Sequence, residues 1–123
     1  MTIRAMSPIA ALDHVQVAAP PGCEGDARRF YGKLLGLTEI PKPDELEPRG
    51  GVWFAVGDAH QLHVGVAEDF TPARKAHPAF SVAPGELEPL AARLVEAGVD
   101  IAWDDRRFHA HDPWGNRLEV LER

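Results

Sequence analysis

The sequence predicts an α+β domain built from two copies of a βαβββ module. Two amphipathic stripes with helical spacing, in 27–35 and 87–95, each end at a glycine. A strand-like segment that begins with a histidine, His14 or His77, precedes each stripe. Each stripe is followed by a strand, a loop and a hairpin, so the two halves match as internal repeats.

The first module covers about residues 9–66. Its expected elements are a strand at 12–17, a helix at 26–35, a strand at 37–40, and a hairpin with strands at 51–56 and 61–66. Three prolines and three acidic residues predict a surface loop at 41–50. The polar segment 67–76 then connects the halves.

The second module covers about residues 77–123 and repeats this order. Its expected elements are a strand at 77–82, a helix at 87–95, and a hairpin with strands at 106–111 and 117–121. With 123 residues and 45% hydrophobic composition, residues 1–123 suit one folded domain rather than two.

Composition excludes several partners and sites. The net charge of -6 argues against nucleic acid and anionic membrane surfaces. One cysteine, Cys23, rules out an intrachain disulfide and paired-thiolate zinc sites. No apolar run is long enough to span a membrane, and the segment 1–8 does not resemble a signal peptide, so we expect a cytoplasmic protein.

Strand alternation places four potential metal ligands opposite the apolar faces. They are His14, His63, His77 and Glu119. If the halves pack as a pseudo-repeat, His14 lies opposite His77 and His63 opposite Glu119. Three imidazoles and a carboxylate suit Fe, Mn, Co, Ni or Zn. Each residue alone is also compatible with a solvated strand face, and His63 with a polar cavity wall.

Four segments resemble the vicinal oxygen chelate superfamily, which includes glyoxalases, bleomycin-resistance proteins and dioxygenases. They are Leu-Asp-His-Val at 12–15, Arg-Phe-Tyr at 29–31 with Leu-Leu-Gly-Leu at 34–37, His-Pro-Ala-Phe-Ser-Val at 77–82, and Asp-Pro-Trp-Gly-Asn-Arg-Leu-Glu at 112–119. The resemblance covers nearly the whole chain. We see no signature of a fosfomycin-resistance enzyme and only one domain, whereas the extradiol dioxygenases usually have two.

The resemblance implies a divalent metal held by His14, His77 and Glu119, with Glu119 also the most important residue for catalysis. The fourth family position often holds Glu or Gln and falls on His63, which weakens a glyoxalase I assignment. Single-domain members usually pair, so we expect a homodimer.

Three further residues are candidates for substrate binding. Arg107 and His109 share a strand face and suit an anionic substrate, although an edge hairpin also carries solvated charges. Trp53 suits an apolar ligand, although packing or a position on the surface of a hairpin explains it better.

Two functions remain open. The first is a metal-dependent enzyme, a glyoxalase-like lyase or isomerase or a dioxygenase, acting on a small oxygen-chelating molecule. The second is a metal-free drug-binding protein similar to the bleomycin-resistance members. Those members generally lack the full ligand set, which this chain retains, so we favour the enzyme.

Overall fold

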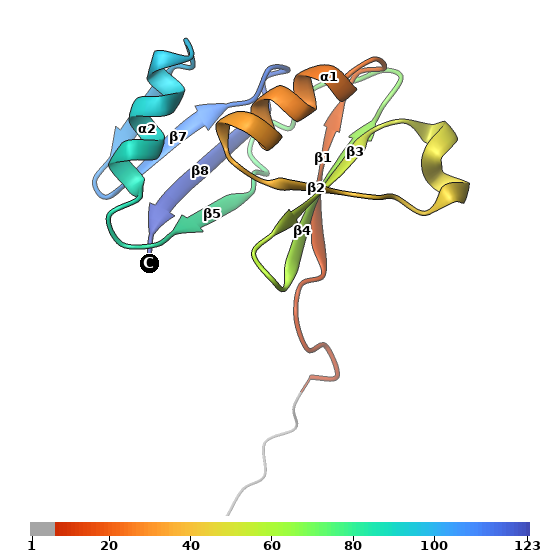
Figure 1. The fold of residues 1–123 in the computed structure, drawn as a ribbon, viewed down its shortest axis with the longest axis horizontal. Helices are drawn as coiled ribbons and strands as arrows, with labels where there is room; N and C mark the ends of the chain where they lie inside the picture. The colour runs from red at the N-terminus through yellow and green to blue at the C-terminus, as the bar shows by residue number, and fades with distance from the viewer. Residues whose placement is uncertain (1–6) are drawn as a thin grey trace, which may run out of the picture.

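The computed structural model describes residues 7–123, which form two four-stranded sheets with helices packed against them (Figure 1). The expected α+β class and paired βαβββ modules are confirmed. In chain order the elements are β1 (His14–Ala19), α1 (Glu24–Ala27), η1 (Arg28–Leu34), β2 (Thr38–Ile40), η2 (Asp44–Arg49), β3 (Val52–Val56), β4 (His60–Val66), β5 (Ala79–Val82), α2 (Leu87–Glu96), β6 (Ile101–Asp104), β7 (Arg107–His111) and β8 (Arg117–Glu122).

Both sheets have the same topology. Their strand orders are β1-β4-β3-β2 and β5-β8-β7-β6. The first and last strands of each module pair in parallel, and the remaining pairs are antiparallel. The strands β1 and β5 therefore each form one edge of their sheet, and β2 and β6 form the opposite edges.

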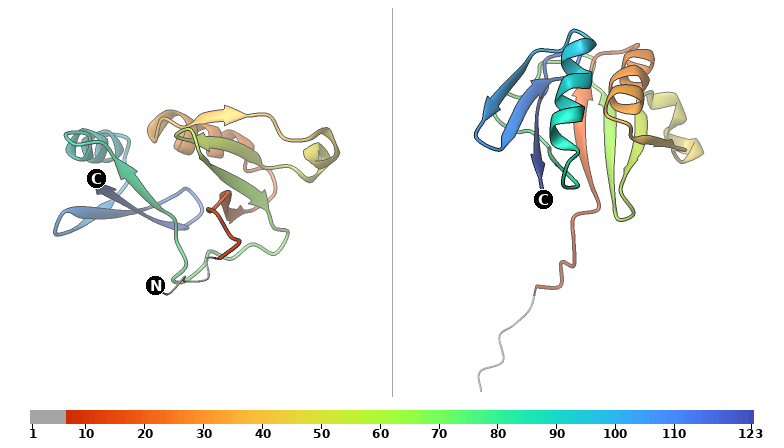
Figure 2. Two further views of the ribbon diagram at one scale, coloured as in Figure 1. Left: turned by 90° about the horizontal axis from the view of Figure 1, so that it is seen from below. Right: turned by 60° about the vertical axis from the view of Figure 1, so that its left-hand side comes forward.

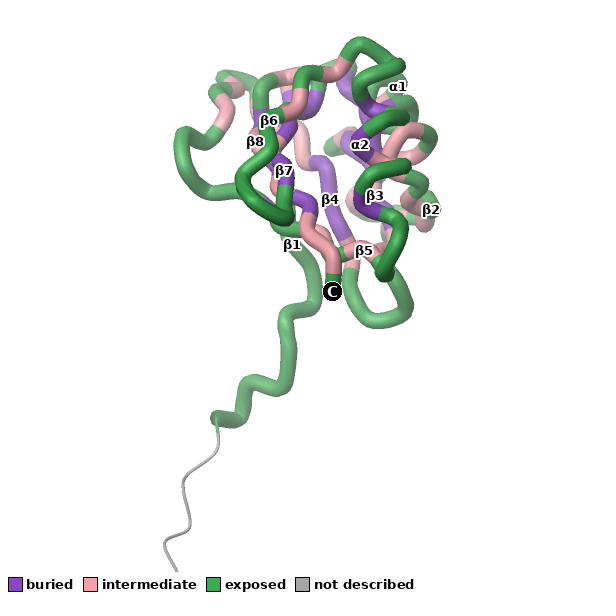
Figure 3. The backbone as a smooth tube through the Cα atoms, turned by 90° about the vertical axis from the view of Figure 1, so that its left-hand side faces the viewer, coloured by how far each residue is buried: buried purple, intermediate pink, exposed green. Residues whose placement is uncertain are grey.

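One face of each sheet is apolar and buried, as the alternation predicts. Leu62 and Val64 on β4, and Leu118 and Val120 on β8, are at most 1% exposed. The buried stretches follow the inner strands and the helix faces turned toward them (Figure 3). The residues between them in sequence, including His63 and Glu119, therefore lie on the opposite face of each sheet.

The first helix differs from the regular α-helix expected at 26–35. It begins at Glu24 and continues from Arg28 to Leu34 as a π-helix, in which the Leu35 N–H donates to the carbonyl of Phe30 at 3.0 Å. Phe30 and Tyr31 are both buried by this wider turn. Such a turn depends on packing against the sheet, so the helical spacing of the sequence does not reveal it.

Two other boundaries differ from expectation. The predicted loop at 41–50 contains the short 3₁₀ helix η2. The strand predicted from His77 begins at Ala79, because Pro78 has no N–H to donate to a neighbouring strand. The carbonyl of Pro78 still accepts the N–H of Glu119 at 3.1 Å, which holds the segment beside β8.

Buried polar contacts join the two modules. The Tyr31 hydroxyl donates to Asp112 Oδ2 at 2.8 Å, and the Asn116 side-chain amide donates to the Ala18 carbonyl at 2.7 Å. On the helix side, Arg93 donates to the carbonyl of Leu34 at 3.1 Å. Figure 2 shows α1 and α2 lying side by side above the two sheets, as this last contact requires.

Within residues 7–123, no helix combines the length and apolar character needed to cross a bilayer. Residues 1–6, part of the segment behind the expected cytoplasmic location, lie outside the described residues. The location in the cell stays a prediction.

Candidate metal centre

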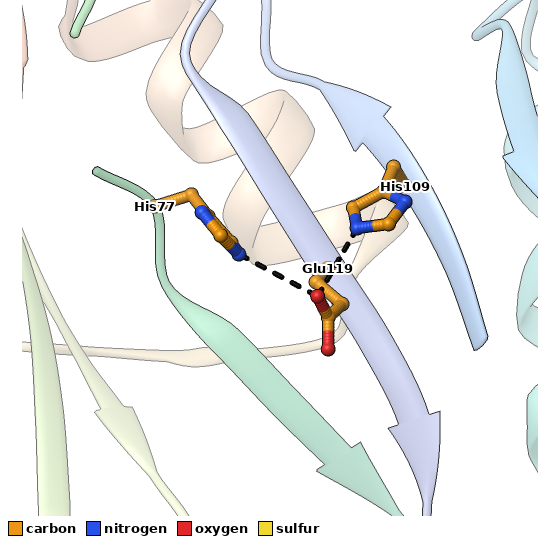
Figure 4. A group of neighbouring side chains, drawn as sticks. All are labelled: His77, His109 and Glu119. Atoms are coloured by element: carbon orange, nitrogen blue, oxygen red, sulfur yellow. Dashed lines mark hydrogen bonds and ion pairs between the residues drawn. The ribbon is translucent and has the colours of Figure 1, made fainter. Parts of the chain in front are cut away.

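Three potential metal ligands meet on the second sheet, on the face opposite its buried core. Glu119 of β8 lies between the buried Leu118 and Val120, so its side chain projects from the other face. His109 of β7 pairs in register with Glu119. His77, just before β5, reaches the same carboxylate from the other side (Figure 4).

The three side chains share one carboxylate oxygen. Glu119 Oε1 lies 3.1 Å from His109 Nε2 and 3.5 Å from His77 Nε2. One donor atom from each residue lies within 4.8 Å of the others. The Glu119 and His109 side chains are only 12% and 16% exposed, whereas the His77 side chain is 27% exposed and forms the side of the group that is open to water.

Neighbouring groups fix how these side chains are presented. The Nδ1–H of His77 donates to the carbonyl of Lys75 at 2.8 Å, so Nε2 is the ring nitrogen that faces Glu119. Arg107 donates to the other oxygen, Glu119 Oε2, at 3.1 Å. Glu119 Oε1, His77 Nε2 and His109 Nε2 therefore face one another, and a metal ion would replace the contacts among these three atoms.

Glu119 is held in its charged form. Burial by itself raises the pKa of this carboxyl. The hydrogen bond from His109, the charge of Arg107 and the contact with His77 outweigh burial, and the pKa lies below its usual value. The site therefore has an anionic oxygen at neutral pH.

The equivalent positions of the first sheet hold a stack of rings. Trp53 of β3 pairs in register with His63 of β4, as His109 does with Glu119. The Trp53 and His63 rings lie 3.8 Å apart and 2° from parallel, and the His14 ring stacks on His63 at 4.1 Å. Burial, and then the nearby His14, hold the pKa of His63 below its usual value. His14 Nδ1 pairs with Asp13 at 2.9 Å.

The structure thus divides the four predicted ligands between two groups. Among the described residues, His77 and Glu119 come together, while His14 and His63 stack on Trp53 in the other module. His109 and Arg107, both expected to bind substrate, contact Glu119. The expected hairpin contained a signal for this contact. If residue 111 pairs with residue 117 across the turn, His109 lies opposite Glu119.

A cavity of about 510 Å³ lies between the edge strands of the two modules, and it reaches both groups. His14 and His77 both line it. The remaining lining residues come from the ends of β1, β3, β4 and β5 and the segments beside them: Leu12, Val15, Val56, His60, Gln61, Leu62, Pro78, Ala79, Phe80 and Ser81.

The donors at the second sheet fit a divalent first-row metal. Two imidazole nitrogens and one carboxylate oxygen suit Fe, Mn, Co, Ni or Zn. Because the three donors all lie on one face of the second sheet, a bound ion would keep other coordination positions for substrate oxygens or for a further imidazole.

Comparison with known proteins identifies the family. The family model of the glyoxalase/bleomycin resistance protein/dioxygenase superfamily matches residues 12–120. Among curated proteins, a glutathione transferase FosA from Serratia marcescens is 33% identical over 100 residues, which are 74% of this chain and 67% of that protein. We recognised no motif of a fosfomycin-resistance enzyme in the sequence, so the motifs did not anticipate this relative.

Solved structures agree with this assignment. A protein assigned to the glyoxalase family from Bacillus anthracis superposes with a TM-score of 0.89 at 44% identity, covering 97% of this chain and 99% of that one. A glyoxalase/dioxygenase from Nostoc punctiforme has the same fold, with a TM-score of 0.80 at 20% identity, covering 99% and 98% of the two chains. The chain belongs to the glyoxalase/bleomycin resistance protein/dioxygenase superfamily.

Proposed function

We propose that this protein is a metal-dependent enzyme whose divalent ion is held by His77, His109 and Glu119. The observation that carries the proposal is the single oxygen, Glu119 Oε1, placed within 3.5 Å of two imidazole nitrogens while Arg107 holds the other oxygen. Exposure to solvent does not explain why two imidazoles converge on one largely buried carboxylate, whereas a shared metal ion does.

The residues around the site divide the work. A bound Fe, Mn, Co, Ni or Zn ion would act as a Lewis acid for oxygen atoms of the substrate. His77 and Glu119 supply a neutral and an anionic donor, and the Lys75 carbonyl keeps His77 in the required tautomer. Arg107 orients the carboxylate and leaves part of its guanidinium for an anionic group of the substrate.

The reaction proposed is that of a glyoxalase-like lyase or isomerase, a transferase or a dioxygenase, acting on a small molecule with neighbouring oxygens. Family membership supports this range, and the relative at 33% identity is named a glutathione transferase. Trp53, expected to bind substrate, is half-buried and stacked on His63, and we propose that it borders the bound substrate.

We further propose a homodimer in which His14 of one copy reaches the metal of the other. Within one chain His14 is outside the His77–His109–Glu119 group. Its Nδ1 nevertheless pairs with an acceptor, Asp13, as the Nδ1 of His77 pairs with the Lys75 carbonyl, so that Nε2 is the nitrogen left for a metal ion. A twofold dimer would place the first module of each copy against the second module of its partner.

Subunit mixing tests this arrangement. His14→Ala and Glu119→Gln, each deficient in metal alone, are mixed after mild dissociation. If the site is shared, about half of the dimers contain one copy of each variant, and each of these dimers has one intact site and one doubly altered site. About a quarter of all sites should therefore bind metal again. No recovery would place the site within one chain, and light scattering showing a monomer would exclude the dimer itself.

Elemental analysis tests the metal. Protein purified without chelator is expected to contain about one first-row ion per chain, and His77→Ala is expected to contain none. If the wild type takes up no added Mn, Fe, Co, Ni or Zn, the proposed function is wrong. The stacked rings of Trp53, His63 and His14 and the charge of -6 would then favour a binder of cationic, planar drugs.

A further inference from the structure

The cavity between the two modules differs in charge from four other hollows formed by residues 7–123. Its lining within residues 7–123 includes no aspartate, glutamate, lysine or arginine. Four other hollows each include at least one charged residue, for example Lys42 and Arg49 beside Trp53, and Arg117 beside β1.

Apolar side chains from both modules form most of its wall. The first module contributes Leu12, Val15, Val56 and Leu62, and the second contributes Pro78, Ala79 and Phe80. At about 510 Å³ the cavity falls within the range of small-molecule sites, roughly 300–1,000 Å³. It is therefore large enough for a molecule with one or two rings.

The cavity also reaches the metal centre. His77 lines it, and His77 Nε2 lies 3.5 Å from Glu119 Oε1. A molecule that occupies the cavity can thus present one end to His77, the proposed ligand that lines it, while its body contacts the apolar wall. The polar groups of the wall are three imidazoles, from His14, His60 and His77, with Gln61 and Ser81, and they are suited to orient an occupant by hydrogen bonds.

We propose that this cavity binds the body of the substrate, and that this body is uncharged and mainly apolar. The inference rests on the proposed function, because only an enzyme has a substrate to place there. A carboxylate, sulfonate or ammonium group in this cavity would lose hydration and find imidazole, amide and hydroxyl groups there, but no carboxylate, ammonium or guanidinium group of opposite charge. The wall thus selects against a charged peptide thiol such as glutathione as the occupant. It favours a molecule with an aliphatic or aromatic skeleton.

Two fluorescent probes with the same ring system test the proposal without any metal. They are N-phenyl-1-naphthylamine, which is neutral, and 8-anilinonaphthalene-1-sulfonate, which adds one sulfonate. The variant Ser81→Lys places a cation in the wall at an exposed strand position, where it disturbs no buried packing. Thr38→Lys is the matched control, because Thr38 is equally exposed but lies on β2, at the far edge of the first sheet.

The readout is the ratio of the two dissociation constants. The neutral probe is expected to bind wild type at least about tenfold more tightly, because the sulfonate has no partner. Ser81→Lys should reduce this preference by about tenfold, and Thr38→Lys should leave it unchanged. A preference for the sulfonate in wild type, no binding of either probe, or equal effects of both lysine variants would overturn the proposal.

A parallel metal titration of Ser81→Lys separates this inference from the proposed function. Metal binding at one ion per chain together with failed probe selectivity would reject the substrate class alone. Probe selectivity in a protein that binds no metal would reject the metal centre and leave the cavity as a site for an apolar ligand.

Discussion

The two modules share topology and strand register but place different chemistry at equivalent positions. In the second module His77, His109 and Glu119 form a charged, hydrogen-bonded group. In the first module His14, Trp53 and His63 stack face to face. Two exchanges of residue type, Glu119 for His63 and His109 for Trp53, accompany the change from an aromatic to an ionic group.

This difference shows what turns a strand face into a metal centre. The stack in the first module is stabilised by ring contacts, and burial favours the neutral form of His63. The second module has an anion that its neighbours keep charged, and its imidazoles point nitrogen atoms at one oxygen. The predictions below test this contrast and the structure that supports it.

The largest expected effect concerns the turn between β7 and β8. Buried Asp112 accepts hydrogen bonds from Tyr31, Trp114 and Asn116 and joins the modules. Asp112→Ala leaves these donors unpaired and should lower the free energy of unfolding by about 3 kcal/mol. Asp58→Ala, in the exposed turn between β3 and β4, should change it by less than about 0.5 kcal/mol in the same urea titration.

The next effect is on metal affinity. Glu119→Gln keeps the shape of the side chain and removes the only anionic ligand, so Mn²⁺ affinity should fall about 100-fold. His63→Gln, at the equivalent position of the first module, should change it by less than about threefold. Equal affinities of Glu119→Gln and wild type would show that Glu119 is simply a strand carboxylate.

A smaller effect is expected for the imidazole on β7. His109→Gln should weaken Mn²⁺ binding by about tenfold, because it removes one nitrogen donor but leaves the charge of Glu119. His111 lies on the same face of β7, is exposed, and is the control. If His111→Gln and His109→Gln give the same affinity, His109 is not a ligand.

The smallest effect depends on pH. The Gly51 N–H donates to Glu24 at 2.7 Å, and this bond is the main cause that holds the pKa of Glu24 below its usual value. A lowered pKa stabilises the fold above the ordinary pKa of 4.5, and this contribution is lost as the pH falls through the folded value.

Glu24→Gln should therefore cost about 1 kcal/mol at pH 7 and progressively less below pH 4.5. Glu88→Gln is the control, because Glu88 is an exposed acid in the first turn of α2. A cost for Glu24→Gln that does not change with pH would contradict the assigned role of the carboxylate.

Much of the fold was predictable because it follows from local periodicity. Alternation assigned Leu118 and Val120 to the core, and with them the outward face of Glu119, while the glycines and helical stripes defined the repeat. The π-helix at 28–34 and the late start of β5 were not predictable, since they depend on packing and on the missing N–H of Pro78.

The candidate site was only partly predictable for a different reason. Alternation shows on which face of its own strand each of His14, His63 and His109 lies. It does not show which side chains become neighbours when the two modules pack. That choice depends on how the modules pack, through contacts such as Tyr31 with Asp112 that are far apart in sequence. Strand pairing was the missing information that assigns His109 to Glu119.

Titration of the metal-free protein with Co²⁺, followed by its visible absorption, tests the central claim most directly. We predict one Co²⁺ per chain for wild type and for His63→Gln, and no bound Co²⁺ for His77→Ala, because the second module provides the metal centre. Absence of binding to wild type, or the same binding by all three proteins, would contradict the account.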